Sequence, residues 1–157
     1  MSSACYGFAV DQAGAPLVET STPETFQRLY SPYVELGTNW ILSPYLRAGI
    51  LHPIGETTWI LDGAVLASTM GSVSGALGAQ KCFGKWAVGP EAIVGRLFLE
   101  NDFSFPGVFI LAGARAFYSL GASGHALLTL GGYICITSPY GSLNGGPVLS
   151  IGLAYAF

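Results

Sequence analysis

Pro147-Val-Leu-Ser-Ile-Gly-Leu-Ala-Tyr-Ala-Phe157 forms the end of the 157-residue chain, and it alternates large apolar side chains with small ones. Successive side chains of a strand point to opposite faces. One face would carry Leu149, Ile151, Leu153, Tyr155 and Phe157, and the other Val148, Ser150, Gly152, Ala154 and Ala156. A half-solvated strand of a soluble protein would place polar residues opposite the apolar ones. The pattern here favours a strand with lipid on its bulky face and a crowded lumen on the other.

The same eleven residues resemble the C-terminal strand of bacterial outer-membrane β-barrels. In that family the barrel-assembly machinery reads the terminal aromatic residue and the alternating hydrophobic residues. The resemblance covers these residues directly and the rest of the chain only by pattern. It implies a small barrel of the OmpA and OmpX type in the bacterial outer membrane. The expected partners are outer-membrane lipids, lipopolysaccharide and the barrel-assembly machinery.

The composition also favours a membrane protein. Only 10% of the residues are charged, against about 25% in average soluble proteins, while 51% are hydrophobic and the mean hydropathy is +0.52. Residues 116–157 contain no Asp, Glu, Lys or Arg. Membrane helices are an alternative for this region, but nine Gly and Pro residues interrupt it between positions 121 and 147, and this density favours turns between strands.

Several classes of function have no support in the sequence. The net charge is −3 without a cluster of Lys or Arg, which argues against a nucleic-acid partner, and we expect none. Three cysteines, an odd number without metal-ligand spacing, predict neither a disulfide framework nor a zinc site. Phosphate-binding, dinucleotide-binding, zincin and EF-hand motifs are missing, so we expect no cofactor and no metal.

The chain divides into an N-terminal extension, residues 1–31, and a barrel, residues 32–157. Thr22-Pro23-Glu24 has the residues that begin a helix, which predicts a short one over Thr25–Tyr30. Cys5–Val10 is also compatible with a strand. After Pro32, turn signals at 41–43, 53–56, 70–74, 87–90, 102–106, 120–124 and 138–146 separate segments of about the length that a tilted strand needs to cross a bilayer. The expected strands are 32–40, 44–52, 57–69, 75–86, 91–101, 107–119, 125–137 and 147–157, which predicts an all-β, antiparallel, up-and-down transmembrane β-barrel of eight strands.

Most charged residues in these segments lie on the face opposite the large apolar residues. We expect a lumen charge network of Glu35, Arg47, Asp62, Lys81, Lys85, Arg96, Glu100 and Arg115. An eight-stranded barrel is only wide enough for side chains to fill it, and enclosed charges must be paired. The network should therefore brace the wall. Lys81 and Lys85 fit worst, since Gln80 and Cys82 would then face lipid, which suggests a bulge or a register error. A gated ion path along the lumen is the alternative.

Outward aromatic residues should form girdles at the level of the lipid headgroups. Trp59, Trp86, Tyr118, Tyr155 and Phe157 fall at the end of the barrel where the chain terminates, and Trp40 falls at the other end.

The sequence offers little for catalysis. His52 and His125 lie near turns, and Ser119, Ser123 and Asp62 are conceivable companions of His125, but their spacing matches no motif. Glu100 and Asp102 flank a turn, where acids are common. We therefore expect no enzyme, although some small outer-membrane barrels do modify lipids.

The short expected loops favour a role in membrane integrity, narrow small-solute passage or lipid contact. A soluble, lipocalin-like or avidin-like barrel that binds an apolar ligand is an alternative. Its exterior would carry few of the charges that solubility needs, because the chain has only six basic and nine acidic residues. An apolar exterior packed against further copies of the chain is a third possibility.

Overall fold

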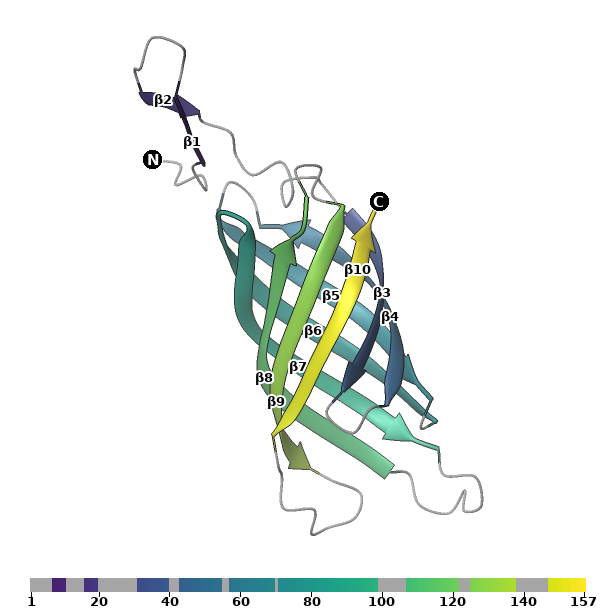
Figure 1. Ribbon diagram of the computed structural model, residues 1–157. Coiled ribbons are helices and arrows are strands. Elements are labelled where there is room, and N and C mark those ends of the chain that lie inside the picture. The colour runs from purple at the N-terminus through teal and green to yellow at the C-terminus, as the bar shows by residue number, and fades with distance from the viewer. Residues whose placement is uncertain are drawn as a thin grey trace.

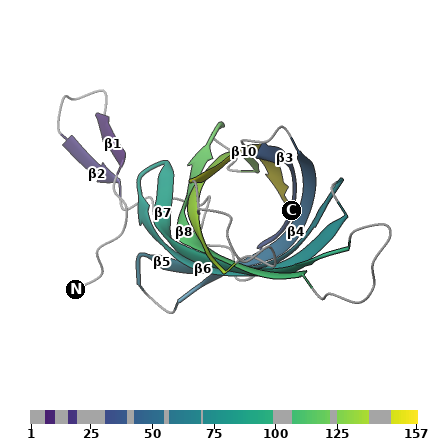
Figure 2. The ribbon, with the colours of Figure 1, turned by 90° about the horizontal axis from the view of Figure 1, so that it is seen from below.

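The computed structural model describes residues 7–10, 16–19, 31–39, 43–54, 57–69, 71–98, 107–121, 125–137 and 147–157. Eight antiparallel strands close into a barrel in the order β10-β3-β4-β5-β6-β7-β8-β9 (Figures 1 and 2). These strands are β3 (Ser31–Asn39), β4 (Pro44–Pro53), β5 (Trp59–Ser68), β6 (Ser72–Phe83), β7 (Trp86–Leu97), β8 (Gly107–Ser119), β9 (Ala126–Thr137) and β10 (Val148–Ala156). Each strand pairs with its neighbour along the chain, and β10 pairs with β3 to complete the ring. The prediction of an eight-stranded, up-and-down antiparallel barrel is confirmed.

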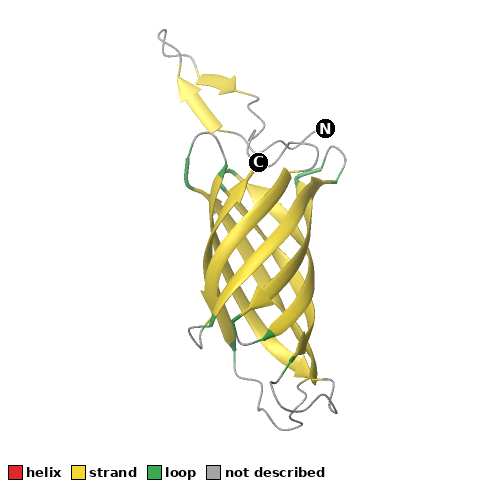
Figure 3. Cartoon of the chain, turned by 90° about the vertical axis from the view of Figure 1, so that its right-hand side faces the viewer, coloured by secondary structure: helices red, strands yellow, loops and turns green. Residues whose placement is uncertain are grey.

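Two further strands, β1 (Gly7–Val10) and β2 (Pro16–Glu19), pair with each other in a separate two-stranded sheet. The strand considered for Cys5–Val10 thus overlaps β1, which does not add to the barrel. The helix expected over Thr25–Tyr30 lies outside the described residues. Figure 3 shows the described residues as strands joined by loops and turns. In the part of the chain that the structure describes, no helix has the length and apolar composition needed to cross a membrane.

Six of the expected strands match observed ones to within two residues at each end, and β6 and β7 differ more. The turn expected at 87–90 is wrong. The chain turns at Gly84-Lys85, because Phe83 pairs directly with Trp86. Gly84 has a φ of 56°, which glycine adopts at little cost and which suits a two-residue hairpin loop.

Pro90 lies inside β7 and explains why its neighbourhood resembles a turn in the sequence. Gly78 pairs with Glu91 and Lys81 pairs with Val88, but the β6–β7 ladder has no pairs between them. A proline has no N–H to donate to a ladder, so the gap falls where Pro90 lies. The register is the same on both sides of this gap. The bulge suggested for the Lys81 strand is therefore not found there, and the register shift in the barrel lies between β8 and β9 at Ile110/Leu111.

The two faces of the wall differ in the size and polarity of their side chains. Outward positions carry large apolar residues such as Leu36, Val65, Leu77 and Leu153, each at least 60% exposed. Inward positions combine glycines with aromatic and polar residues. A large side chain can therefore extend across the lumen over a glycine, which has no side chain. Three such glycine–aromatic pairs face each other across neighbouring strands: Gly49 with Tyr33, Gly37 with Tyr45, and Gly95 with Phe109.

Buried side chains fill the lumen on both sides of its centre. Toward the end where the chain terminates, an apolar cluster includes Leu51, Ile60, Ala87, Phe117 and Leu127. Toward the opposite end, a second cluster centres on Ala76, Ile93 and Tyr133. Polar and charged side chains occupy the space between the two clusters.

Candidate functional site: the charge network in the lumen

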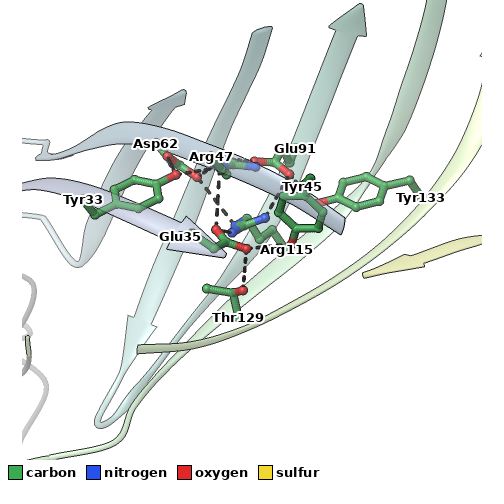
Figure 4. A network of polar contacts seen from close by, with 9 residues as sticks. All are labelled: Tyr33, Glu35, Tyr45, Arg47, Asp62, Glu91, Arg115, Thr129 and Tyr133. Atoms are coloured by element: carbon green, nitrogen blue, oxygen red, sulfur yellow. Dashed lines mark hydrogen bonds and ion pairs between the residues drawn. The ribbon is translucent and has the colours of Figure 1, made fainter. Parts of the chain in front are cut away.

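Five charged side chains from five strands meet in the centre of the lumen (Figure 4). Each of these residues is at most 3% exposed. They are Glu35 in β3, Arg47 in β4, Asp62 in β5, Glu91 in β7 and Arg115 in β8. Because each strand contributes an inward position at the same depth, the network joins strands that are not neighbours in the wall.

Arg47 links two of the carboxylates. Its Nη2 donates to Asp62 Oδ2 at 2.6 Å and to Glu91 Oε1 at 2.5 Å, and its Nε donates to the hydroxyl of Tyr33 at 2.7 Å. The two carboxylates lie on β5 and β7, so one guanidinium connects β4 with strands on either side of β6.

Arg115 completes the network from the opposite wall. Its Nη2 donates to Glu35 Oε2, and its Nε lies 3.8 Å from Asp62 Oδ2. Its guanidinium carbon lies 4.9 Å from the ring centroid of Phe117, within the range of a cation–π contact. Phe117 belongs to the apolar cluster on the side of the chain terminus, so this contact joins the network to the packed layer.

Neutral hydroxyl groups satisfy the remaining acceptor positions. Tyr33 donates to Asp62 Oδ1 at 2.7 Å, Tyr45 donates to Glu35 Oε1 at 2.7 Å, and Tyr133 donates to Glu91 Oε2. Thr129 also donates to Glu35 Oε1, at 2.7 Å. Each carboxylate therefore receives at least one guanidinium N–H and one tyrosine hydroxyl. The carboxylates thus have the partners under which buried charges are tolerated, whereas Arg47 Nη1 and Arg115 Nε are buried without a hydrogen-bond partner among the described residues.

These buried side chains occupy the centre of the barrel. A cavity of about 100 Å³ borders Arg47, Arg115 and Tyr133 on the side away from the chain terminus, and several serines line it. This volume exceeds the roughly 10–15 Å³ of probe-occupied space that one water needs, so the cavity can hold water. Chemically, the site can brace strands and hold a few waters, and its charges already have partners among themselves.

The structure brings together four of the residues that the sequence predicted for the lumen: Glu35, Arg47, Asp62 and Arg115. Lys81, Lys85 and Arg96 are exposed instead, so their prediction as lumen residues is wrong. Lys81 points outward because Gln80 and Cys82, its neighbours on β6, are buried. Glu100 lies outside the described residues.

Glu91 is the charged residue of the network that the sequence prediction missed, along with the hydroxyl donors Tyr33, Tyr45, Thr129 and Tyr133. It is 3% exposed and lies on the inward face of β7 together with Ile93, whereas Arg96 lies on the outward face. Glu91 and Arg96 are five positions apart, so a regular strand cannot turn both inward. The signal that could have separated them is depth. Arg96 is next to the strand end, where an outward charge reaches water or a headgroup, and Glu91 is nearer the middle.

The aromatic residues expected at the terminal end lie on the outer wall. Trp59, Trp86, Tyr155 and Phe157 are 38% to 61% exposed. The ring centroids of Trp86 and Tyr118 are 4.6 Å apart, and those of Tyr155 and Phe157 are 5.3 Å apart. Trp40, expected at the other end, lies outside the described residues.

The side chains considered for catalysis are engaged elsewhere. His125 Nδ1 lies 2.7 Å from the carbonyl oxygen of Ala156. The imidazole stacks on the ring of Tyr155, with 5.7 Å between the ring centroids. Ser119 donates to the carbonyl of Gly121 at 3.0 Å, and Asp62 belongs to the network. Ser123 and Asp102 lie outside the described residues. His52 is half-buried in β4. Among the residues that the structure describes, no cluster of His, Cys, Asp and Glu could hold a metal ion.

These features define a transmembrane-like eight-stranded β-barrel with a buried charged network in its lumen. The chain matches no protein-family model, and no curated protein matches it. Among solved structures it is similar to a chain described as "De novo design of transmembrane beta-barrels". The sequence identity is 16%, the TM-score is 0.46, and the match covers 82% of this chain and 94% of the other.

Proposed function

We propose that this protein spans the bacterial outer membrane as a closed barrel whose role is structural, in membrane integrity. The observation that carries the proposal is the inversion of polarity across the wall. The buried charges lie at the centre, while 25 large hydrophobic residues of the described segments are exposed. A soluble barrel would present the opposite arrangement, because an apolar exterior of this extent aggregates in water.

The distance between outward charges on the wall fits a membrane. Arg96 pairs with Val73 on β6, and Lys81 lies eight residues further along the same strand. At about 3.4 Å per residue and a strand tilt of about 40°, the two cations are about 21 Å apart along the barrel axis. The apolar band of outer-membrane barrels is about 25 Å tall. The exposed positions of β6 between them, such as Gly75 and Leu77, carry no charge.

The packing of the lumen supports a closed barrel rather than a solute pore. Apolar clusters lie on both sides of the network, and the cavity beside it is about 100 Å³. Pockets for drug-sized ligands measure about 300–1,000 Å³, so this cavity, lined by described residues, is too small for a lipocalin-like ligand. A larger groove of about 810 Å³ is lined mainly by outward residues of the wall, among them Val88, Leu130 and Ile151. In a membrane this groove faces acyl chains.

The end of the barrel that holds the chain terminus fits the periplasmic side. Its β6–β7 turn has only two residues, Gly84 and Lys85, and short turns are typical of the periplasmic end of these barrels. The outward side chains of β10 end on Tyr155 and Phe157, both exposed. We propose that the barrel-assembly machinery reads this strand, and that lipopolysaccharide surrounds the opposite end. We propose no enzymatic activity.

Three kinds of experiment test this function: folding in detergent, bilayer conductance and a lipid-modification assay. Folding into detergent should give a β-rich circular dichroism spectrum and a heat-modifiable band on a gel, and insertion into a planar bilayer should give no stable conductance steps. A monodisperse monomer without detergent would contradict the membrane barrel, and large charge-selective steps would contradict the closed lumen. Lipid hydrolysis or acyl transfer that disappears in His125→Ala would contradict the absence of catalysis.

A further inference from the structure

The outer wall carries a small cationic surface at the end where the chain terminates. Lys81 points outward from β6, where it pairs with Trp59 of β5 on one side and Val88 of β7 on the other. Lys85 is exposed in the two-residue turn that follows Phe83. Two ammonium groups therefore lie within one hairpin, β6–β7, which Figure 1 places on one side of the barrel.

Aromatic side chains lie beside Lys81, and Trp86 follows Lys85 in the sequence. Lys81 Nζ lies 5.4 Å from the ring centroid of Phe83. Phe83 pairs across the hairpin with Trp86, whose ring packs on Tyr118. Trp59, Phe83 and Trp86 are 38%, 55% and 40% exposed. Indole and phenol groups combine an apolar body with a polar edge, which suits the depth of lipid headgroups.

The lysines have no protein anion to balance them among the described residues. Every ion pair that the structure shows there belongs to the lumen network. In a membrane, an outward lysine at this depth extends toward the phosphate level. Two such ammonium groups beside aromatic rings present hydrogen-bond donors and positive charge to an oxyanion.

We propose that Lys81, Lys85, Trp59, Phe83 and Trp86 form a binding site for the headgroup of an anionic phospholipid. Its phosphodiester would accept hydrogen bonds from the two ammonium groups, and its glycerol and upper acyl region would lie against the aromatic rings. A second ammonium favours an anionic lipid over a zwitterionic one, because a choline headgroup brings its own positive charge. This inference rests on the proposed membrane insertion.

The test uses the full chain with Trp40→Phe, so that tryptophan fluorescence, excited selectively over that of tyrosine, comes only from Trp59 and Trp86. The folded protein is placed in phosphatidylcholine vesicles that contain brominated phosphatidylglycerol or brominated phosphatidylcholine at equal mole fraction. Each lysine near an anionic surface contributes about fivefold in association, so we expect phosphatidylglycerol to associate about 5- to 25-fold more strongly at the fluorescent site. K81Q/K85Q should lose this preference, and K81R/K85R should keep it.

Arg96→Gln is the matched control, because it removes one outward cation from the other end of the wall. It should leave the preference at the two tryptophans unchanged. Equal quenching by both brominated lipids in the unmodified lysine background would overturn the headgroup site while leaving the membrane barrel intact. If neither brominated lipid quenched the fluorescence, the tryptophans would not meet a membrane, and this would overturn the proposed function.

Discussion

Replacing Arg47 by methionine should destabilise the barrel more than any other single change at the network. The methionine keeps much of the apolar stem of the side chain but removes the hydrogen bonds to Asp62, Glu91 and Tyr33, of 2.6, 2.5 and 2.7 Å. It also leaves two buried carboxylates that have lost their closest cation. Removing one partner of a buried ion pair costs about 3–5 kcal/mol. Since Arg47 serves two carboxylates, we expect a loss near the upper end of that range.

The assay is urea-dependent unfolding from lipid vesicles, followed by tryptophan fluorescence and by the heat-modifiable gel band. Arg96→Met is the matched control, because it makes the same substitution at an exposed position, where changes are usually within about 0.5 kcal/mol. A triple variant that adds Asp62→Asn and Glu91→Gln should recover at least half of the loss, because no unpaired buried charge then remains.

Two results would refute this reasoning. One is an Arg47→Met barrel within about 1 kcal/mol of the unmodified protein, which would mean that the network contributes little. The other is a triple variant less stable than Arg47→Met alone. That outcome would locate the loss in packing at the site, not in uncompensated charge.

Three further predictions concern the wall. Gly152→Ala should lower the free energy of unfolding in urea by about 1–3 kcal/mol, because the new Cβ would lie 2.5 Å from a carboxylate oxygen of Glu35. Gly63→Ala is the control: its Cβ would meet nothing within 4 Å, so stability should stay unchanged or rise. Leu77→Arg should destabilise the barrel in lipid by about 2–4 kcal/mol more than Leu77→Ala, since this side chain is 66% exposed on the outer face; equal losses would show that the position does not face hydrocarbon. Phe157→Ala should still fold in detergent but give less heat-modifiable barrel in cells, and an unchanged cellular yield would argue against recognition of the C-terminal residue.

The sequence was most informative where side-chain size and polarity follow the wall. In β10 the large residues are exposed as the alternation predicts, with Leu153 at 60% and Ile151 at 50%. The same reasoning places Arg47 and Asp62 inward, because each lies near the middle of a strand whose opposite face is bulky and apolar. At such a position an outward charge could reach neither lipid headgroups nor water. The charged side chain must therefore face the lumen.

It was least informative at β6 and β7. The two-residue turn has a single glycine, Gly84, to signal it, while Gly89-Pro90 has the composition of a turn but lies within a strand. A strand that starts at position 91 places Glu91 at the strand end, where a charged side chain can reach water without facing the lumen. Arg96 then became the predicted lumen residue of this strand. When two charged residues of one strand would face opposite sides of the wall, the one nearer the middle of the membrane must face inward. The depth of each residue can be read from the sequence only if the turn that starts the strand is placed correctly.

The network also explains how this wall specifies one register. Because inward and outward residues alternate, a one-residue slip between strands would turn a whole strand inside out, and small apolar residues such as alanine tolerate either face. Glu35, Asp62 and Glu91 do not, since a slip would move a carboxylate from its guanidinium partner into the apolar face. Slips by two residues keep the faces but separate the partners in depth, as for Glu35 and Arg47, which pair directly across β3 and β4. The buried charges therefore penalise the misregistered barrels that hydrophobic burial alone would accept.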